Sequence, residues 1–158
     1  MAFLYLAPVI SSTSSLYFAW DQYLFLRIFL KKDIQVHANR LQASYWQTFF
    51  PQAAFSVIGL VGITSGVSFY LLKTSGALLQ EKGSYNWYLA SGVLALCHFF
   101  WVPPIKPIIN ALQDNKKDVD KGTETLRKWI RVHLTRAPTA DLGCFICSVV
   151  AAVKTLSA

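Results

Sequence analysis

The chain contains three long runs without a charged residue, and these runs constrain its fold more than any other feature. They cover Met1–Trp20, Leu41–Leu72 and Gly83–Ile105, and a fourth run, Ala137–Val153, is interrupted only by Asp141. A helix needs about 20 predominantly apolar residues to cross the hydrocarbon core of a bilayer. Since 54% of the residues are hydrophobic and only 15% are charged, the sequence predicts an all-α integral membrane protein.

The expected architecture is a four-transmembrane-helix bundle that forms a single membrane domain over residues 1–158. We expect helices at about 3–30, 46–72, 84–103 and 126–155. Pro103 and Pro104 should end the third helix, because proline cannot continue one. The first run lacks a basic segment before it and a small-residue cleavage site after it, so we interpret it as a helix and not as a signal peptide.

The placement of basic residues predicts the orientation of the bundle. Of the fifteen Lys and Arg side chains, all but Lys73, Lys82 and Lys154 fall in or beside the connections after the first and third helices. Cytosolic connections of membrane proteins carry the excess of Lys and Arg. We therefore expect both connections in the cytosol and both termini on the non-cytosolic side. The net charge of +7 needs no nucleic acid, because membrane lipid with anionic headgroups attracts the same side chains.

Ionisable side chains within the predicted helices are functional candidates by default in a bilayer. Asp21, His98 and Asp141 lie at similar distances from the cytosolic ends of their helices, roughly 7–8 Å deep at 1.5 Å per residue. Arg136 lies at the edge of the last helix. Three helices would then present an acid or a base at one level, as a shared buried pocket requires. We expect these four residues to be the catalytic ones.

A structural interpretation of the same charges stays open. The two Asp residues can pair with Arg136, Arg27 or His98 and lock the helices together. A metal site formed by His98, His133 and the two Asp residues lacks any recognisable ligand spacing, so we expect no metal.

Aromatic side chains near these positions are expected to form the walls of a substrate pocket. At helical spacing, Tyr17 shares a face with Asp21, and Trp101 lies near the face of His98. The candidate substrate-binding residues are Tyr17, Trp20, Trp46, Trp101 and His133.

Small residues on the second helix suggest a packing surface. Gly62 and Gly66 form a small-xxx-small pair, which lets another helix approach closely. We favour packing within the chain over homo-oligomerisation for this pair, and the second possibility stays open.

Cys144 and Cys147 form a Cys-x-x-Cys motif, which invites comparison with the quinone and vitamin K epoxide reductases. That chemistry needs a second pair of cysteines, whereas only Cys97 remains in this chain. We therefore interpret Cys144 and Cys147 as small apolar packing residues.

Three segments carry a resemblance to a known family: Ser15–Asp21 (Ser-Leu-Tyr-Phe-Ala-Trp-Asp), Ser44–Pro51 (Ser-Tyr-Trp-Gln-Thr-Phe-Phe-Pro) and Leu126–His133 (Leu-Arg-Lys-Trp-Ile-Arg-Val-His), the last followed by Arg136 and Asp141. They resemble the fungal branch of the anthrone oxygenase-like (DUF1772) membrane proteins. The resemblance covers nearly the whole chain in helix order and spacing, through aromatic and charged positions instead of one diagnostic motif.

The resemblance implies a four-helix protein of secondary metabolism. From this setting and the predicted topology we expect residence in the endoplasmic reticulum. Some members of the family oxidise anthrones to anthraquinones without a bound metal or flavin, so no cofactor is expected. The resemblance transfers this setting better than it transfers a substrate.

The expected function is that of a tailoring enzyme for a hydrophobic polyketide or terpenoid that enters from the membrane. His98 or a buried Asp would remove the acidic proton of an anthrone-like substrate. The resulting enolate can react directly with O₂, while Arg136 or His133 stabilises the oxyanion.

Two other functions fit the same residues. A cyclase or pericyclase of Diels–Alder type would gain mainly by orienting a polyene or terpenoid and by a hydrogen bond to its carbonyl. A non-enzymatic scaffold would pair its intramembrane charges with the helices of a partner protein.

Overall fold

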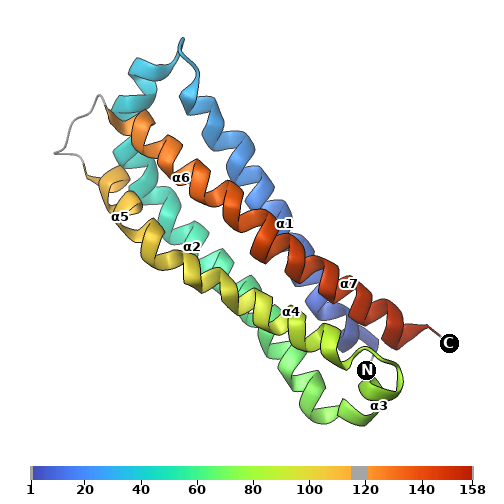
Figure 1. The fold of residues 1–158 in the computed structure, drawn as a ribbon. Helices are drawn as coiled ribbons and strands as arrows, with labels where there is room; N and C mark the ends of the chain where they lie inside the picture. Colours follow the sequence, from blue (N-terminus) through green and yellow to red (C-terminus); the bar gives the residue numbers. More distant parts are fainter. Residues whose placement is uncertain (1, 115–120, 158) are drawn as a thin grey trace.

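The computed structural model describes residues 2–114 and 121–157, and within these ranges the chain is helical and contains no strand. The all-α prediction is therefore confirmed for this part of the chain. Long helical segments run up and down the molecule, and both termini lie at the end that holds α3 (Figure 1). The elements are α1 (Ala2–Leu26), η1 (Arg27–Leu30), α2 (Gln35–Thr74), α3 (Gly76–Glu81), α4 (Tyr85–Cys97), η2 (His98–Trp101), α5 (Val102–Gln113), α6 (Gly122–Arg136), η4 (Ala137–Asp141) and α7 (Leu142–Leu156).

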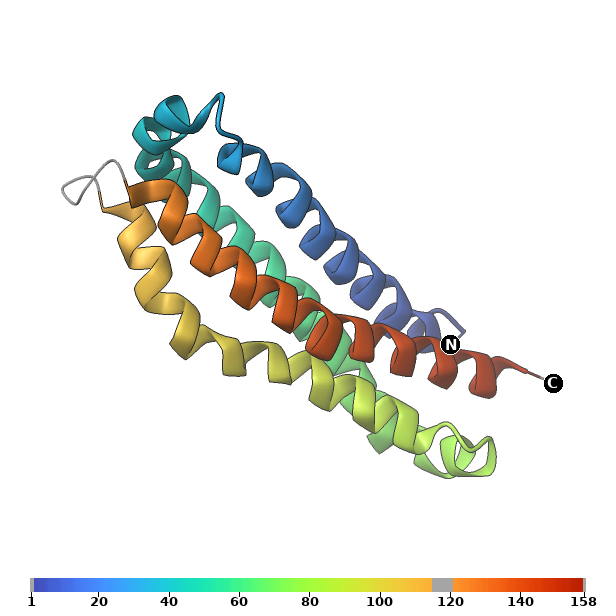
Figure 2. The same ribbon diagram turned by 45° about the horizontal axis from the view of Figure 1, so that its top comes forward.

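The helices form one bundle with two differently composed halves. Near the termini, α1 and α4 each pack against α2 and α7; toward the other end, α5 and α6 pack against each other and against α2 (Figure 2). Large side chains, including Trp46 and Trp129, fill the core between α2, α5 and α6. Hydroxyl pairs join helices in the other half, where Ser11 bonds Thr64 and Ser91 bonds Ser148, both at 2.7 Å. Interhelical hydrogen bonds of this kind suit a bundle surrounded by lipid.

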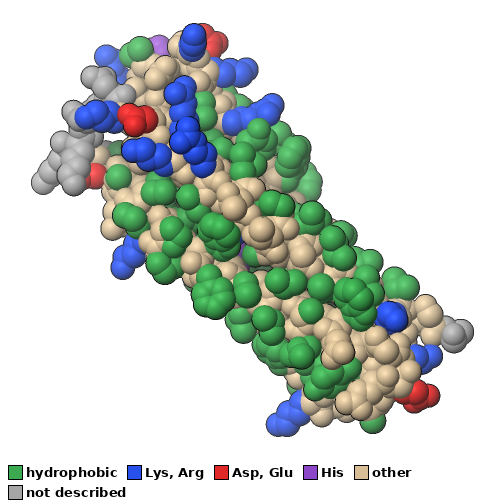
Figure 3. Space-filling view, in the orientation of Figure 1, with side chains coloured by type: hydrophobic (Ala, Val, Ile, Leu, Met, Phe, Trp, Pro, Cys, Tyr) green, Lys and Arg blue, Asp and Glu red, His purple; other side chains and the backbone are tan. Residues whose placement is uncertain are grey.

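Three helical segments are long and apolar enough to cross a membrane: Gln35–Thr74, Tyr85–Gln113 and Gly122–Leu156. Large apolar side chains point outward from them, as at Phe55 (82% exposed) and Phe100 (77% exposed). In the view of Figure 3, Lys and Arg side chains gather toward the two ends of the molecule, and hydrophobic side chains cover much of the surface between them. These findings indicate a membrane protein. A fourth span through α1, the side that the termini face and residence in the endoplasmic reticulum stay predictions.

The helix bounds differ from the predicted ones at two places. α2 begins at Gln35, well before the expected start near residue 46, and the third segment continues to Gln113 instead of ending at 103. Pro103 and Pro104 follow the 3₁₀ turn η2 and occupy the first turn of α5. The N–H groups of a first turn have no partner within the helix, so prolines cost little there. The prolines begin a helix where we expected them to end one.

The glycines of α2 do not pack within the chain. A Cβ atom added at Gly62 or Gly66 would meet no atom within 4 Å, so our preference for packing within the chain is wrong. The buried face of α2 is formed instead by side chains such as Val61, Thr64 and Ser68. Homo-oligomerisation through Gly62 and Gly66 stays a prediction.

A close approach between two helices occurs at Gly92 of α4. A Cβ atom there would lie 3.0 Å from the ring of Phe69 and 3.3 Å from Cβ of Ser68. We expect Gly92→Leu to lower the free energy of unfolding by about 1–3 kcal/mol more than Gly62→Leu does, because only the former forces side chains apart. The two variants gain the same helix propensity, so their difference reports packing. Unfolding of the detergent-solubilised protein by SDS measures it, and equal stability of the two variants would contradict the close approach.

Candidate active site

Two irregular turns bring the buried charges together. His98 begins the 3₁₀ turn η2, and Asp141 ends the π-helical turn η4. Pro138 lies within η4 and cannot donate a hydrogen bond to the carbonyl one turn earlier. In a π turn the backbone bonds join residues five apart, so Arg136 and Asp141 lie one turn from each other on the same side of the helix. Arg136 Nε donates to Asp141 Oδ2 at 3.3 Å.

Hydrogen bonds extend this pair into a buried cluster of His98, His133, Arg136 and Asp141, which we call the charged cluster. Asp141 Oδ1 lies 3.1 Å from His98 Nδ1, and a terminal nitrogen of Arg136 lies 3.1 Å from His133 Nδ1. His133 Nε2 lies 2.8 Å from the carbonyl oxygen of Ala19 in α1. The cluster therefore connects α1, η2, α6 and η4 through groups that are all buried.

The network assigns a role to each ring nitrogen. Arginine only donates, so His133 Nδ1 accepts from Arg136, and His133 Nε2–H donates to Ala19. In the same way, the Asp141 carboxylate accepts Nδ1–H from His98, which leaves the His98 Nε2 lone pair free. When a carboxylate orients an imidazole in this way, the other ring nitrogen is positioned to accept a proton.

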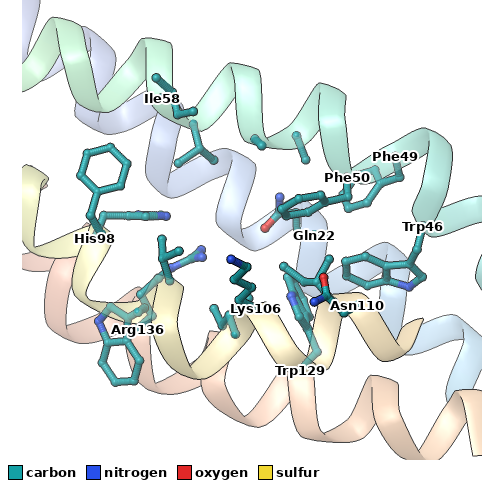
Figure 4. Close-up of a pocket in the computed structure, with 18 residues that line it drawn as sticks. Gln22, Trp46, Phe49, Phe50, Ile58, His98, Lys106, Asn110, Trp129 and Arg136 are labelled. Carbon is teal, nitrogen blue, oxygen red and sulfur yellow. The ribbon is translucent and has the colours of Figure 1, made fainter. Parts of the chain in front are cut away.

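The free nitrogen faces a cavity of about 440 Å³, which we call the main cavity. His98 and Arg136 point into it from one end, and Trp46 and Trp129 line the other (Figure 4). Trp46 is held in place by a 2.9 Å hydrogen bond from Nε1 to Gln42 and by edge contact with Trp129. The volume and the mostly apolar lining suit a small hydrophobic molecule. The lining residues are Gln22, Trp46, Phe49, Phe50, Ala53, Ala54, Val57, Ile58, His98, Phe99, Trp101, Val102, Ile105, Lys106, Ile109, Asn110, Trp129 and Arg136.

Several of the predicted site residues meet in the structure. Asp141 contacts both His98 and Arg136, and His133 joins them through Arg136. Trp46 and Trp101 also line the main cavity, with Trp46 at the end opposite His98 and Arg136.

Asp21 does not join this group. Its side chain is half-buried, and within the described residues it makes no hydrogen bond or ion pair with the charged cluster. The next residue, Gln22, faces the main cavity instead. Successive residues of a helix point about 100° apart, so a correct depth along α1 did not ensure the correct face.

Tyr17 and Trp20 also lie outside the main cavity. They line a second cavity of about 420 Å³ between α1 and the α6–η4–α7 segment, with His133 in its wall. The charged cluster thus lies between two cavities, with His98 and Arg136 on one and His133 on the other.

Sequence reasoning missed Gln22, Lys106, Asn110 and Trp129 among the cavity residues. Trp129 stacks on His133, with ring centroids 4.6 Å apart and an interplanar angle of 17°, and their i, i+4 spacing could have revealed the pair. Lys106 and Asn110 have the same spacing on α5. Gln22 carried no such signal.

The cysteines form no disulfide among the described residues. Cys97, Cys144 and Cys147 are free thiols, and Cys144 is buried against Ser91, 3.4 Å from its carbonyl oxygen. Across residues 2–114 and 121–157, no group of three His, Cys, Asp or Glu side chains is arranged to hold a metal ion.

Comparison with known proteins finds relatives along almost the whole chain. It is 27% identical to a probable epoxidase, ScpX, of Mollisia scopiformis and 27% identical to an epoxidase, PydX, of an Acremonium species, each over 153 residues. It is 26% identical to an epoxidase, GkaX, of Penicillium citrinum over 155 residues. The matches cover 96% of this chain and 93–94% of each relative.

No family model matches the chain, and no solved structure matches it. Membership of the anthrone oxygenase-like family therefore stays a prediction. What the comparisons establish is similarity, over nearly full length, to fungal proteins that are named as epoxidases.

Proposed function

We propose that this protein is a membrane-embedded tailoring enzyme of fungal secondary metabolism that oxidises a hydrophobic small molecule in the main cavity. One observation carries the proposal: the His98 imidazole and the Arg136 guanidinium both face one end of an apolar cavity, and the Asp141 carboxylate orients the imidazole. The epoxidase names of the relatives favour oxygen transfer over ring closure.

The reaction begins with a proton transfer. A substrate with a C–H bond made acidic by conjugation to a carbonyl group, as in the CH₂ group that two rings flank in an anthrone, places that bond against His98 Nε2. The imidazole takes the proton, and the electron pair moves onto the carbonyl oxygen as an enolate. Arg136 can donate an N–H to this oxyanion while Nε remains bonded to Asp141, because guanidinium has five donors. Asp141 stabilises the imidazolium that forms on His98.

Molecular oxygen is the oxidant. The enolate carbon forms a bond to O₂, which is reduced to a peroxide, and the imidazolium returns its proton to give a hydroperoxide. Transfer of the outer oxygen to a carbon–carbon double bond then breaks the O–O bond and yields an epoxide and an alcohol. With an anthrone the same hydroperoxide loses water and leaves a quinone. In both cases the electrons balance with one O₂ per substrate.

The cavity walls supply orientation and exclude water. Phe49, Phe50 and the tryptophans offer flat apolar surfaces to a conjugated or ring-containing substrate. Holding the reacting groups in one geometry removes part of the entropic barrier. The same walls protect the hydroperoxide from side reactions with water.

The test uses membranes that carry the protein, incubated with an anthrone or with a polyene ketone under ¹⁸O₂ and under argon. We expect products that contain ¹⁸O, formed only in oxygen and only with His98 intact. A cyclised isomer that forms equally well under argon would overturn the oxidation and favour the cyclase. A His98→Gln variant that leaves all ¹⁸O incorporation unchanged would overturn the assigned site.

A further inference from the structure

An exposed lysine, Lys106, carries a positive charge at the rim of the main cavity that the proposed chemistry does not use. Lys106 and Asn110 both line the cavity from α5, one helical turn apart. In Figure 4 the Lys106 side chain extends over the cavity, with its amine on the side of Arg136 and Gln22. α5 leads from the charged cluster toward the end of the bundle opposite the termini (Figure 1), so this pair lies on the route between the cluster and that end.

The charges around the cavity do not cancel. Arg136 is paired with Asp141, whereas no carboxylate among the described residues lies within ion-pair distance of Lys106. Within the part of the chain that the structure describes, Lys106 is thus the one lining cation without a counter-charge. Lys106 is exposed, so its ammonium is accessible to an anionic group that enters the mouth of the cavity.

We propose that the substrate of this cavity is an amphiphile with an acidic head group, whose anionic oxygen binds Lys106 and Asn110. The carboxylate or enolate of the head group accepts a charge-assisted hydrogen bond from the amine, and the Asn110 amide supplies a second donor. The apolar body then extends between Trp46, Phe50 and Trp129 and brings its reactive carbon to His98. This inference rests on the proposed function only in calling the ligand a substrate. The binding of an acidic amphiphile does not depend on that function.

An anionic oxygen can also come from the phosphate of a membrane lipid. The two sources differ in the size of the attached group, because a single-chain acid fits a cavity of about 440 Å³ and a two-chain phospholipid does not. The experiment therefore needs both ligands.

The probe is cis-parinaric acid, a conjugated polyene fatty acid that accepts energy from tryptophan. Trp46, Trp101 and Trp129 all line the cavity, so bound probe reports through quenching of their emission. Purified protein in a nonionic detergent is titrated with the acid and with its methyl ester at mildly alkaline pH, where the carboxyl group is ionised and lysine is still charged. Hexadecanoic acid and dioleoylphosphatidic acid then serve as competitors.

We expect the acid to bind roughly tenfold more tightly than the ester, because one charge-assisted hydrogen bond contributes about that difference in affinity. Lys106→Gln should remove this preference without changing binding of the ester, which shows that the cavity is intact. Lys106→Arg should retain the preference. Arg131→Gln is the matched control, since Arg131 is an exposed residue of α6 that does not line the cavity, and it should behave as the unchanged protein.

Three results would overturn the inference. They are equal affinity for acid and ester, an equal loss of preference in Arg131→Gln, and displacement by phosphatidic acid that is stronger than displacement by hexadecanoic acid. The assay involves no turnover. A protein that prefers acids through Lys106 but never oxidises a substrate would refute the proposed function and leave this inference standing.

Discussion

Replacement of His98 by glutamine is expected to reduce the rate of ¹⁸O incorporation by about 10²–10⁴-fold. In the structure His98 Nδ1 is bonded to Asp141, so Nε2 is the nitrogen that faces the main cavity. A glutamine amide can still donate to Asp141 and preserve packing, but it cannot accept a proton from carbon. The loss should therefore appear in kcat, with little change in substrate affinity.

His37→Gln is the matched control for this experiment. His37 lies exposed in the first turns of α2, remote from the charged cluster, and the same chemical change there should leave the rate unchanged. Quenching of tryptophan emission by bound ligand shows that the cavity of the His98 variant is intact. Full activity of His98→Gln would exclude this imidazole as the base.

Replacement of Asp141 by asparagine should affect both stability and turnover. The Asp141 carboxylate forms a buried ion pair with Arg136, with 3.3 Å between Arg136 Nε and Asp141 Oδ2. Removal of one partner leaves a buried guanidinium uncompensated, which costs about 3–5 kcal/mol of unfolding free energy. Turnover should fall as well, because His98 loses the group that orients it. SDS unfolding and ¹⁸O incorporation measure the two effects on the same preparation.

A double variant separates the two effects. Arg136→Met combined with Asp141→Leu replaces the ion pair by apolar side chains of similar size, and such replacements are often neutral or stabilising. We expect this protein to regain most of the stability lost in Asp141→Asn and to remain inactive. An active double variant would show that the ion pair only locks the helices, as the structural interpretation holds. An Asp141→Asn variant of unchanged stability would show that the carboxylate does not balance Arg136.

The predictions that held best depended on properties counted along the chain. Long uncharged runs predicted helices that can cross a membrane, and the depth of His98 and Asp141 within those runs predicted that they meet. Prediction from local rules failed at Pro103 and Pro104, because whether a proline ends a helix or begins one depends on the turn before it. It failed again at Gly62, since small size permits close packing but does not select the neighbour.

The sequence by itself determined that the chain is helical, that its helices are long and apolar enough to cross a membrane, and that His98 and Asp141 lie at one level within them. Only the tertiary structure decided which of these groups face one another. Hydropathy reports position along a helix axis, whereas contact depends on rotation about that axis, and a step of one residue turns a side chain by about 100°. That rotation directs Gln22 instead of Asp21 into the main cavity, and the π turn at Pro138 brings Asp141 to Arg136.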